Sequence, residues 1–224
     1  VPDYLTHSTK IDKSSKRYFI QSETCIKYMP SLRYSRQYAN KSLDKDSESN
    51  NKIILIILDG NKSSSQRTLD IASKSLTKAN YNYELLIKFH PTIPIENFKI
   101  DWNISYRETK ESLDDLLPKV YKVISSSQTS SCIDTLIYSI PTAIVLSEES
   151  IFLNPLESLQ GSVNIKTIKN QNELTKFLNE RNNNKIDDYN RFNDLIYISQ
   201  DYAPWKELLT SIYSKQERIK NNID

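Results

Sequence analysis

Histidine and hydroxyl side chains follow apolar segments of this sequence at places where they could bind a phosphate. His90 comes directly after the predicted strand 83–89 and precedes Pro91, and residues 125–131 read SSSQTSS. The proline restricts the backbone of His90 to an extended conformation. The first turn of a helix leaves unpaired N–H groups that attract anions, and hydroxyl groups there add further donors. We therefore predict a phosphate site in which the His90 imidazole stabilises the negative charge on a leaving group.

Each of these signals also has an ordinary structural explanation. Ser127 or Thr129 could simply cap the helix that follows, and His90 could be a surface histidine at the start of a loop. Asp59-Gly60 is common turn chemistry. Asp134 comes one helical turn after Ser130 and Ser131 and could contact a sugar hydroxyl or cap a neighbouring backbone. The cations Lys62, Arg67 and Lys88 lie near the same predicted edge, where charged side chains are usually solvated.

The elements that position these residues are short apolar runs alternating with helical segments. We predict strands at residues 53–58, 83–89, 103–106, 120–125, 142–146 and 163–166, and helices at 65–79, 111–117, 129–138, 172–179 and 204–215. Fully apolar strands that alternate with helices are typical of a parallel sheet covered on both faces. The predicted fold class is thus α/β, a Rossmann-like parallel sheet with helices on both faces. The candidate residues then meet at the carboxyl edge of that sheet.

Composition excludes several classes of function. The chain has 224 residues with a formal net charge of +2, so nothing in its charge favours nucleic acid or a membrane surface as partner. Its longest apolar run, residues 53–58, is too short to span a bilayer. Cys25 and Cys132 lie far apart, which argues against a zinc site or a redox pair and favours reduced cysteines in the cytoplasm.

Several short motifs occur in an order that resembles a known family. They are Leu32-Arg33-Tyr34, Asp59-Gly60, Lys88-Phe89-His90-Pro91, the serine run Ser125–Ser131 with Asp134, Ile140-Pro141, and residues 152–156 and 204–209. This order resembles the carboxy-terminal half of a family of bacterial surface-carbohydrate biosynthesis proteins, which are GT-B-type glycosyltransferases. The His-Pro pair with a later Ser/Thr-rich helix start is also similar to bacterial sialyltransferases and Kdo transferases.

The resemblance implies a donor-binding domain for a nucleotide-activated sugar, with CMP favoured as the nucleotide. It implies His90 as the catalytic residue and a donor site formed by Asp59, Gly60, Lys88, His90, Pro91, Ser126, Ser127, Thr129, Ser130, Ser131 and Asp134. No metal or other cofactor is expected. The expected partners are the nucleotide sugar, a glycan acceptor and an amino-terminal domain of the same protein, with no nucleic acid and at most peripheral membrane association.

The residue pattern divides the chain into three parts. Residues 1–39 form a leading βα segment with a strand at 17–21, residues 40–52 are a polar linker, and residues 53–224 form the Rossmann-like domain with its C-terminal helix. Two departures from the family pattern stand out. Ser139-Ile140-Pro141 lacks the glycine usual before that proline, and Asp59-Gly60 inverts the usual Gly-Asp.

Two other functions remain open. The first is a nucleotide-sugar epimerase of the same architecture, although only His7 and His90 are available as histidine catalysts. The second is a Rossmann-like module without catalytic activity. The presence of only two glycines favours this module slightly, because loops that approach a phosphate closely usually contain glycine.

Overall fold

The chain forms two compact units in the computed structural model. The model describes residues 4–7, 25–34, 52–80, 82–127, 129–147, 164–180, 196–197, 199 and 201–221. One unit comprises Lys41–Tyr189, and the other joins Val1–Asn40 to Asn190–Asp224. The sequence-based division placed the C-terminal segment with the Rossmann-like domain. In the structure this segment associates with the leading one, since the Trp205 indole N–H donates to the carbonyl of Pro30 at 2.8 Å.

A six-stranded parallel sheet forms the centre of the larger unit. Its strands are β3 (Lys52–Ile57), β4 (Tyr83–Lys88), β5 (Arg107–Glu108), β6 (Val120–Ser126), β7 (Thr142–Val145) and β8 (Ile165–Ile168), in the spatial order β5-β4-β3-β6-β7-β8. Every pairing between neighbours is parallel. This confirms the predicted fold class. The direction of strand order reverses between β3 and β6, which makes that boundary the topological switch point.

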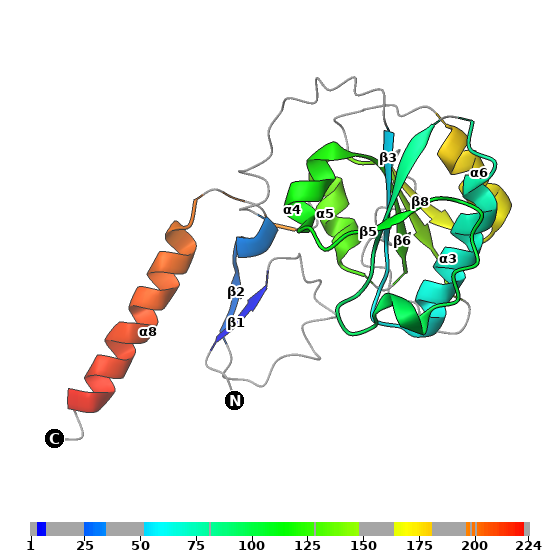
Figure 1. The fold of residues 1–224 in the computed structure, drawn as a ribbon. Coiled ribbons are helices and arrows are strands. Elements are labelled where there is room, and N and C mark those ends of the chain that lie inside the picture. The colour runs from blue at the N-terminus through cyan, green and yellow to red at the C-terminus, as the bar shows by residue number, and fades with distance from the viewer. Residues whose placement is uncertain are drawn as a thin grey trace. The chain divides into compact units, whose positions relative to one another are not determined.

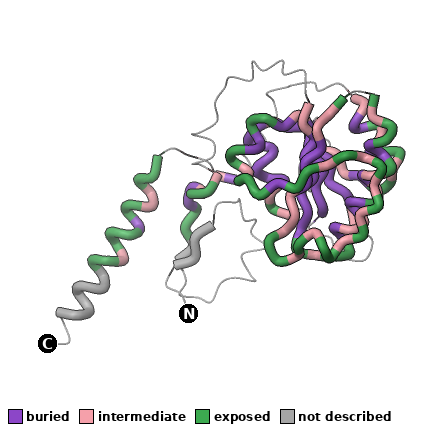
Figure 2. The backbone as a smooth tube through the Cα atoms, viewed as in Figure 1, coloured by how far each residue is buried: buried purple, intermediate pink, exposed green. Residues whose placement is uncertain are grey.

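Helices cover both faces of this sheet. They are α3 (Lys62–Leu76), α4 (Leu113–Leu116), α5 (Ser131–Ile137) and α6 (Gln171–Asn179), with 3₁₀ turns η1 (Ile95–Asn97) and η2 (Leu117–Lys119). Figure 1 shows α3 and α6 on one face and α4 and α5 on the other. Figure 2 shows that the buried residues concentrate on the strands and on the inward sides of these helices. Apolar strand residues such as Ile54 and Ile56 pack there against Leu69 and Leu76 of α3.

A buried lysine joins the sheet to the end of α6. Lys122 in β6 is 1% exposed, and its ammonium group donates to the carbonyls of Phe177, Leu178 and Glu180 at 2.7 Å each. Burial lowers its pKa to about 8, against the opposing effect of Glu180, so the group is still mainly charged at neutral pH. The last carbonyls of a helix lack partners within the helix and carry partial negative charge. Lys122 therefore caps α6 from the sheet.

The turn after α5 explains how the chain does without the expected glycine. Ser139 adopts a left-handed backbone with φ of 52°. The amide of Ser139 donates to the carbonyl of Leu136, and that of Ile140 donates to the carbonyl of Thr135. These two bonds define a Schellman motif, whose left-handed position is usually glycine. A serine takes the strained position here and allows Pro141 to lead into β7.

Several predicted boundaries are corrected by the structure. Residues 103–106 are not a strand. The edge strand is Arg107–Glu108, because Ile104 and Tyr106 instead pack against the core with Trp102. The first large helix begins three residues earlier than predicted, at Lys62, since Asn61 caps it by accepting from the amide of Ser64 at 3.1 Å. The predicted strand at 163–166 is β8, two residues later. Predictions at residues 17–21 and 152–156 lie outside the described residues.

The smaller unit contains a short parallel pair and a long helix. Strands β1 (Tyr4–His7) and β2 (Cys25–Tyr28) pair from Tyr4 opposite Cys25 to His7 opposite Tyr28. Helix α8 spans Ala203–Asn221. The rings of Tyr28 and Tyr197 stack with centroids 5.0 Å apart, and Ser31 N–H donates to the carbonyl of Tyr197 at 2.8 Å. No helix within the described ranges is long and apolar enough to cross a membrane.

Candidate functional site

Asp59 organises the turn from β3 into α3, at the carboxyl edge of the sheet. Its side chain is 3% exposed and accepts three hydrogen bonds. The donors are the amide of Asn61 at 3.0 Å and the hydroxyls of Ser64 at 2.8 Å and Ser65 at 3.0 Å. A buried carboxylate that accepts three hydrogen bonds holds the three donor groups in fixed positions. Asp59 therefore holds the first turn of α3 in place and is not itself presented to solvent.

Hydroxyl groups connect this turn to β6 across the switch point. The Ser64 hydroxyl donates to Asp59, so the Ser127 hydroxyl is the donor in the 3.5 Å contact between Ser127 and Ser64. The Ser126 hydroxyl donates to that of Thr68 at 3.1 Å, and Thr68 donates to the carbonyl of Ser64 at 3.0 Å. All of these residues are at most 3% exposed. This buried network joins the predicted residues Ser126 and Ser127 to α3.

Sequence reasoning missed the α3 side of the network, namely Ser64, Ser65 and Thr68. A signal was present, because an Asn that follows Asp-Gly and precedes three serines is a strong helix-capping pattern. An earlier helix start would have placed Ser64, Ser65 and Thr68 on the inward side of that helix.

His90 follows β4 and is oriented by Thr92. Its Nδ1 lies 3.3 Å from the amide nitrogen of Thr92 and 2.7 Å from the Thr92 hydroxyl. A backbone amide can only donate, so Nδ1 is the acceptor and the neutral ring carries its proton on Nε2. His90 is half-buried and thereby offers an Nε2–H donor with a fixed ring orientation. An N–H donor is what the predicted contact with a phosphate oxygen requires.

The His90 ring lies against Gly60. A methyl group added at Gly60 would come within 3.4 to 3.6 Å of three atoms of the imidazole ring, which is ordinary van der Waals contact. Gly60 is itself exposed. The structure thus brings together the ends of β3 and β4 as predicted, and glycine leaves the His90 ring uncovered on this side.

Lys88 and Pro91 flank His90 in different ways. The Lys88 ammonium donates to the carbonyl of Glu111 at 2.6 Å. Burial lowers the pKa of Lys88, and the nearby Glu111 carboxylate acts in the opposite direction. Lys88 is therefore tied to the segment after β5. Pro91 is exposed at the start of the loop.

The second half of the serine run begins α5 with a less regular cap than predicted. The helix begins at Ser131, and Ser130 precedes it in a helical backbone conformation without a side-chain capping bond. The Thr129 hydroxyl accepts from the amide of Ser131 at 3.2 Å. Ser130 is exposed, and Thr129 and Ser131 are half-buried. These three hydroxyl residues can be reached from solvent.

Asp134 and Cys132 face the interior of the protein. Asp134 is fully buried, which does not match the sugar contact considered for it. Burial, together with the neighbouring Asp134 carboxylate, raises the pKa of Cys132 to about 12. The thiol therefore stays protonated at neutral pH and donates to the carbonyl of Thr129 at 2.9 Å. This excludes Cys132 as a thiolate nucleophile.

The predicted site residues consequently divide into two groups. Asp59, Ser126, Ser127 and Asp134 are buried, and the first three belong to the hydrogen-bonded frame with α3, whereas Gly60, Lys88, His90, Pro91, Thr129, Ser130 and Ser131 are exposed or half-buried. Within the described part of the chain, no group of three or more His, Cys, Asp and Glu residues is placed to hold a metal ion. The arrangement can donate hydrogen bonds to an anion at the carboxyl edge of the sheet.

Comparisons with known proteins show similarity in fold. No protein-family model matches the chain, and no curated protein sequence matches it significantly. Among solved structures, the wall teichoic acid polymerase TagF is similar with a TM-score of 0.51 and 16% identity, over 96% of this chain. A proposed UDP-N-acetylglucosamine 2-epimerase from Listeria monocytogenes has a TM-score of 0.49 and 14% identity over 96% of this chain. The ADP-heptose heptosyltransferase II of E. coli has a TM-score of 0.35 and 11% identity over 66% of this chain.

These similarities concern only part of each known protein. The chain spans 58% of the TagF structure, 60% of the Listeria protein and 46% of the heptosyltransferase. The larger unit has a Rossmann-like fold, a parallel sheet covered by helices on both faces, and the chain is similar in fold to part of TagF. At 16% identity the likeness to TagF extends to the fold and not to the chemistry.

Proposed function

We propose that this chain binds a nucleotide-activated sugar at the carboxyl edge of β3, β4 and β6, as the donor half of a glycosyltransferase for a surface glycan. The observation that supports this most is His90, whose ring is oriented by Thr92 and offers an Nε2–H donor beside the exposed Gly60. Ligands of open parallel sheets bind outside the carboxyl ends of the strands, near the switch point. His90 follows β4, which pairs with β3, one of the two strands at that point.

The proposed roles follow from exposure and hydrogen bonding. Nε2–H of His90 donates to a phosphate oxygen of the donor and stabilises the charge that grows as the sugar leaves. Gly60 permits close approach of that phosphate, because it has no side chain. The hydroxyls of Thr129, Ser130 and Ser131 supply further donors. The buried frame of Asp59, Ser126 and Ser127 acts indirectly by holding the turn after β3 and the end of β6 together.

The finer identity of the donor rests on the family resemblance. We propose a CMP-linked sugar as the donor and a glycan as the acceptor, in a reaction without a bound metal. GT-B enzymes place most acceptor contacts in a second domain. We therefore propose that the base that activates the acceptor hydroxyl lies in a domain outside this chain.

Thermal unfolding with a panel of nucleotides tests this proposal. A ligand at one hundred times its dissociation constant stabilises the folded state by about 2.7 kcal/mol, which a melting curve resolves easily. We expect one member of the panel CMP, UDP, GDP and ADP to raise the melting temperature. His90→Ala should lose the shift, whereas the control His7→Ala, which changes the only other histidine, should keep it. A folded wild-type protein that responds to no nucleotide would contradict the proposal.

Product analysis separates transfer from epimerisation. In the complete protein, a transferase converts the nucleotide sugar into a lengthened acceptor and a free nucleotide. An epimerase of the same architecture changes the sugar without an acceptor. We expect product formation to require the acceptor, and an altered sugar in its absence would overturn the transferase assignment.

A further inference from the structure

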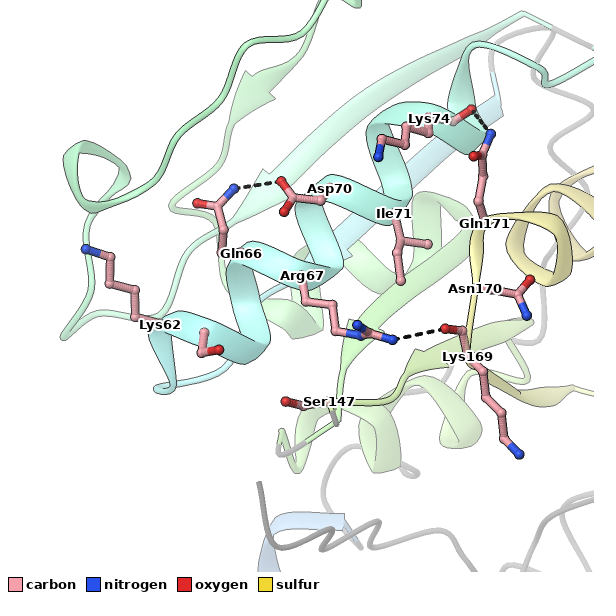
Figure 3. A pocket seen from close by; sticks show the side chains of 11 residues that line it. Lys62, Gln66, Arg67, Asp70, Ile71, Lys74, Ser147, Lys169, Asn170 and Gln171 are labelled. Atoms are coloured by element: carbon pink, nitrogen blue, oxygen red, sulfur yellow. Dashed lines mark hydrogen bonds between the residues drawn. The ribbon is translucent and has the colours of Figure 1, made fainter. Parts of the chain in front are cut away.

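A concave surface lies on the outer side of α3, and its lining includes Lys62 and Arg67, two of the cations that the sequence placed near the carboxyl edge of the sheet. It is a groove of about 950 Å³ between α3, the start of α6 and the segments that follow β7 and β8. Figure 3 shows the outward side chains of α3 along one wall and Lys169, Asn170 and Gln171 along the other. None of the predicted donor-site residues lines it. The groove is therefore a separate candidate site.

The groove is strongly basic. Lys62, Arg67, Lys74 and Lys169 line it, whereas Asp70 is the only acidic residue among its lining residues. The Asp70 carboxylate already accepts from the Gln66 amide at 2.8 Å. None of the three lysine ammonium groups forms an ion pair with a carboxylate among the described residues. Because the whole chain has a net charge of only +2, this concentration of positive charge is a local feature.

Hydrogen bonds fix the shape of the groove. Arg67 reaches from α3 across to the opposite wall, where Nε donates to the carbonyl of Leu146 at 2.9 Å and Nη2 to that of Lys169 at 3.1 Å. Gln171 donates to the carbonyl of Lys74 at 2.9 Å and closes the far end. The dashed lines in Figure 3 show two of these contacts, from Arg67 to Lys169 and from Gln171 to Lys74. The walls are thus held apart at a fixed spacing before any ligand binds.

The spacing of the charges favours a long ligand over a single phosphate. Lys62 and Lys74 lie twelve residues apart on α3, which at 1.5 Å per residue corresponds to about 18 Å along the helix axis. Arg67 lies between them and Lys169 on the facing wall. A single phosphate group cannot reach both Lys62 and Lys74 across that length, whereas an extended chain with repeated negative groups can. No aromatic side chain lines the groove, so the stacking platform typical of single-stranded nucleic acid is missing from this surface.

We propose that this groove binds an extended anionic glycan, a chain of sugars that carries carboxylate or phosphate groups at regular intervals. The choice of a glycan over another linear polyanion rests on the proposed function, since a surface-glycan transferase must hold such a chain. The groove would hold a distal part of the acceptor, while the reacting end lies elsewhere. Binding at the groove does not require the donor nucleotide.

Fluorescence anisotropy with labelled oligosaccharides at physiological salt tests the proposal. The probes are hexagalacturonate, which repeats a carboxylate on every sugar, the neutral maltohexaose, and monomeric galacturonate. The groove variant combines Lys62→Gln, Lys74→Gln and Lys169→Gln. The matched control combines Lys78→Gln, Lys99→Gln and Lys110→Gln, which removes the same charge from exposed lysines that do not line the groove. Arg67 is left intact because its backbone contacts shape the groove.

We expect wild type to bind hexagalacturonate and neither of the other two probes. The groove variant should bind it about tenfold more weakly, since each exposed charge contributes modestly and three are removed, and the control variant should stay within about twofold of wild type. Equal loss in both variants, no loss in the groove variant, or no binding by wild type would overturn the groove proposal. Nucleotide-induced stabilisation, measured on the same samples, reports on the donor site separately. A failure of one proposal is therefore distinguishable from a failure of the other.

Discussion

The Asp59 carboxylate gives the sharpest prediction for the architecture of the candidate site. Replacing Asp59 with Ala removes the acceptor for three donors in a buried position, the Asn61 amide and the hydroxyls of Ser64 and Ser65. A hydrogen bond to a charged group contributes more than a neutral one, and a buried donor left without a partner costs free energy. Even at about 1 kcal/mol for each lost bond, the lower end of the cost of a buried donor without a partner, the free energy of unfolding should fall by at least about 3 kcal/mol.

The isosteric change Asp59→Asn separates the contribution of one oxygen. An asparagine keeps the carbonyl oxygen that accepts from the Asn61 amide and from Ser65, but its amide nitrogen cannot accept from Ser64. We therefore expect a loss of about 1 kcal/mol for Asp59→Asn. The control is Asp70→Ala, which removes an exposed carboxylate with a single bond from Gln66. Such a surface change should stay within about 0.5 kcal/mol.

Urea denaturation followed by circular dichroism measures these differences. The order of destabilisation should be Asp59→Ala, then Asp59→Asn, then Asp70→Ala. For a unit of the size of Lys41–Tyr189, a loss of 3 kcal/mol lowers the melting temperature by about 6–12 °C. Destabilisation by Asp59→Ala no greater than that by Asp70→Ala would refute the view that Asp59 organises the turn between β3 and α3.

Three further changes test other contacts. Lys122→Met should destabilise the larger unit by about 3 kcal/mol in urea denaturation, because three carbonyls at the end of α6 lose a buried donor. A loss of stability below about 1 kcal/mol would contradict the role of Lys122 as a cap of α6. Ser139→Gly should stabilise it by about 0.5–1 kcal/mol, since glycine adopts a positive φ without strain, and any destabilisation would be the contrary result. Thr92→Val removes the hydroxyl that orients His90 and should weaken nucleotide binding about threefold in calorimetric titration with an unchanged melting temperature. Unchanged affinity in Thr92→Val would show that His90 does not depend on that hydroxyl.

The sheet could be predicted from the sequence because its central strands are continuous apolar segments. Residues 53–58 are all apolar, and a run of that kind bounded by polar residues fits a strand buried on both faces. The observed β3 begins and ends one residue earlier than predicted, and β4 ends one residue earlier than predicted. The edge strand β5 was not predicted because it consists of only two residues, both exposed and charged, and so lacks the apolar pattern of the other strands.

The exposed part of the candidate site was easier to predict than its support. His90 was proposed as a site residue because it precedes a proline directly after a predicted strand, where the backbone is held extended. Its orientation by Thr92 depends on a loop conformation that no residue pattern encodes. The burial of Asp134 and of Ser126 follows from how α5 and α3 pack on the sheet, and helical periodicity alone did not fix the exact start of either helix. The basic groove was not predicted from the sequence, because its cations come from α3 and from the segment after β8, which are distant in sequence.

The central claim is that His90 contacts the phosphate of a bound nucleotide. The most direct test is calorimetric titration of wild type and His90→Ala with the nucleotide that the panel selects and with its nucleoside, which lacks the phosphate. A hydrogen bond to a charged group contributes about 1.5–3 kcal/mol, so wild type should prefer the nucleotide by at least about tenfold. His90→Ala should bind the nucleoside as wild type does and lose most of that preference. An equal preference for the nucleotide in both proteins would contradict the assignment of His90 to the donor phosphate.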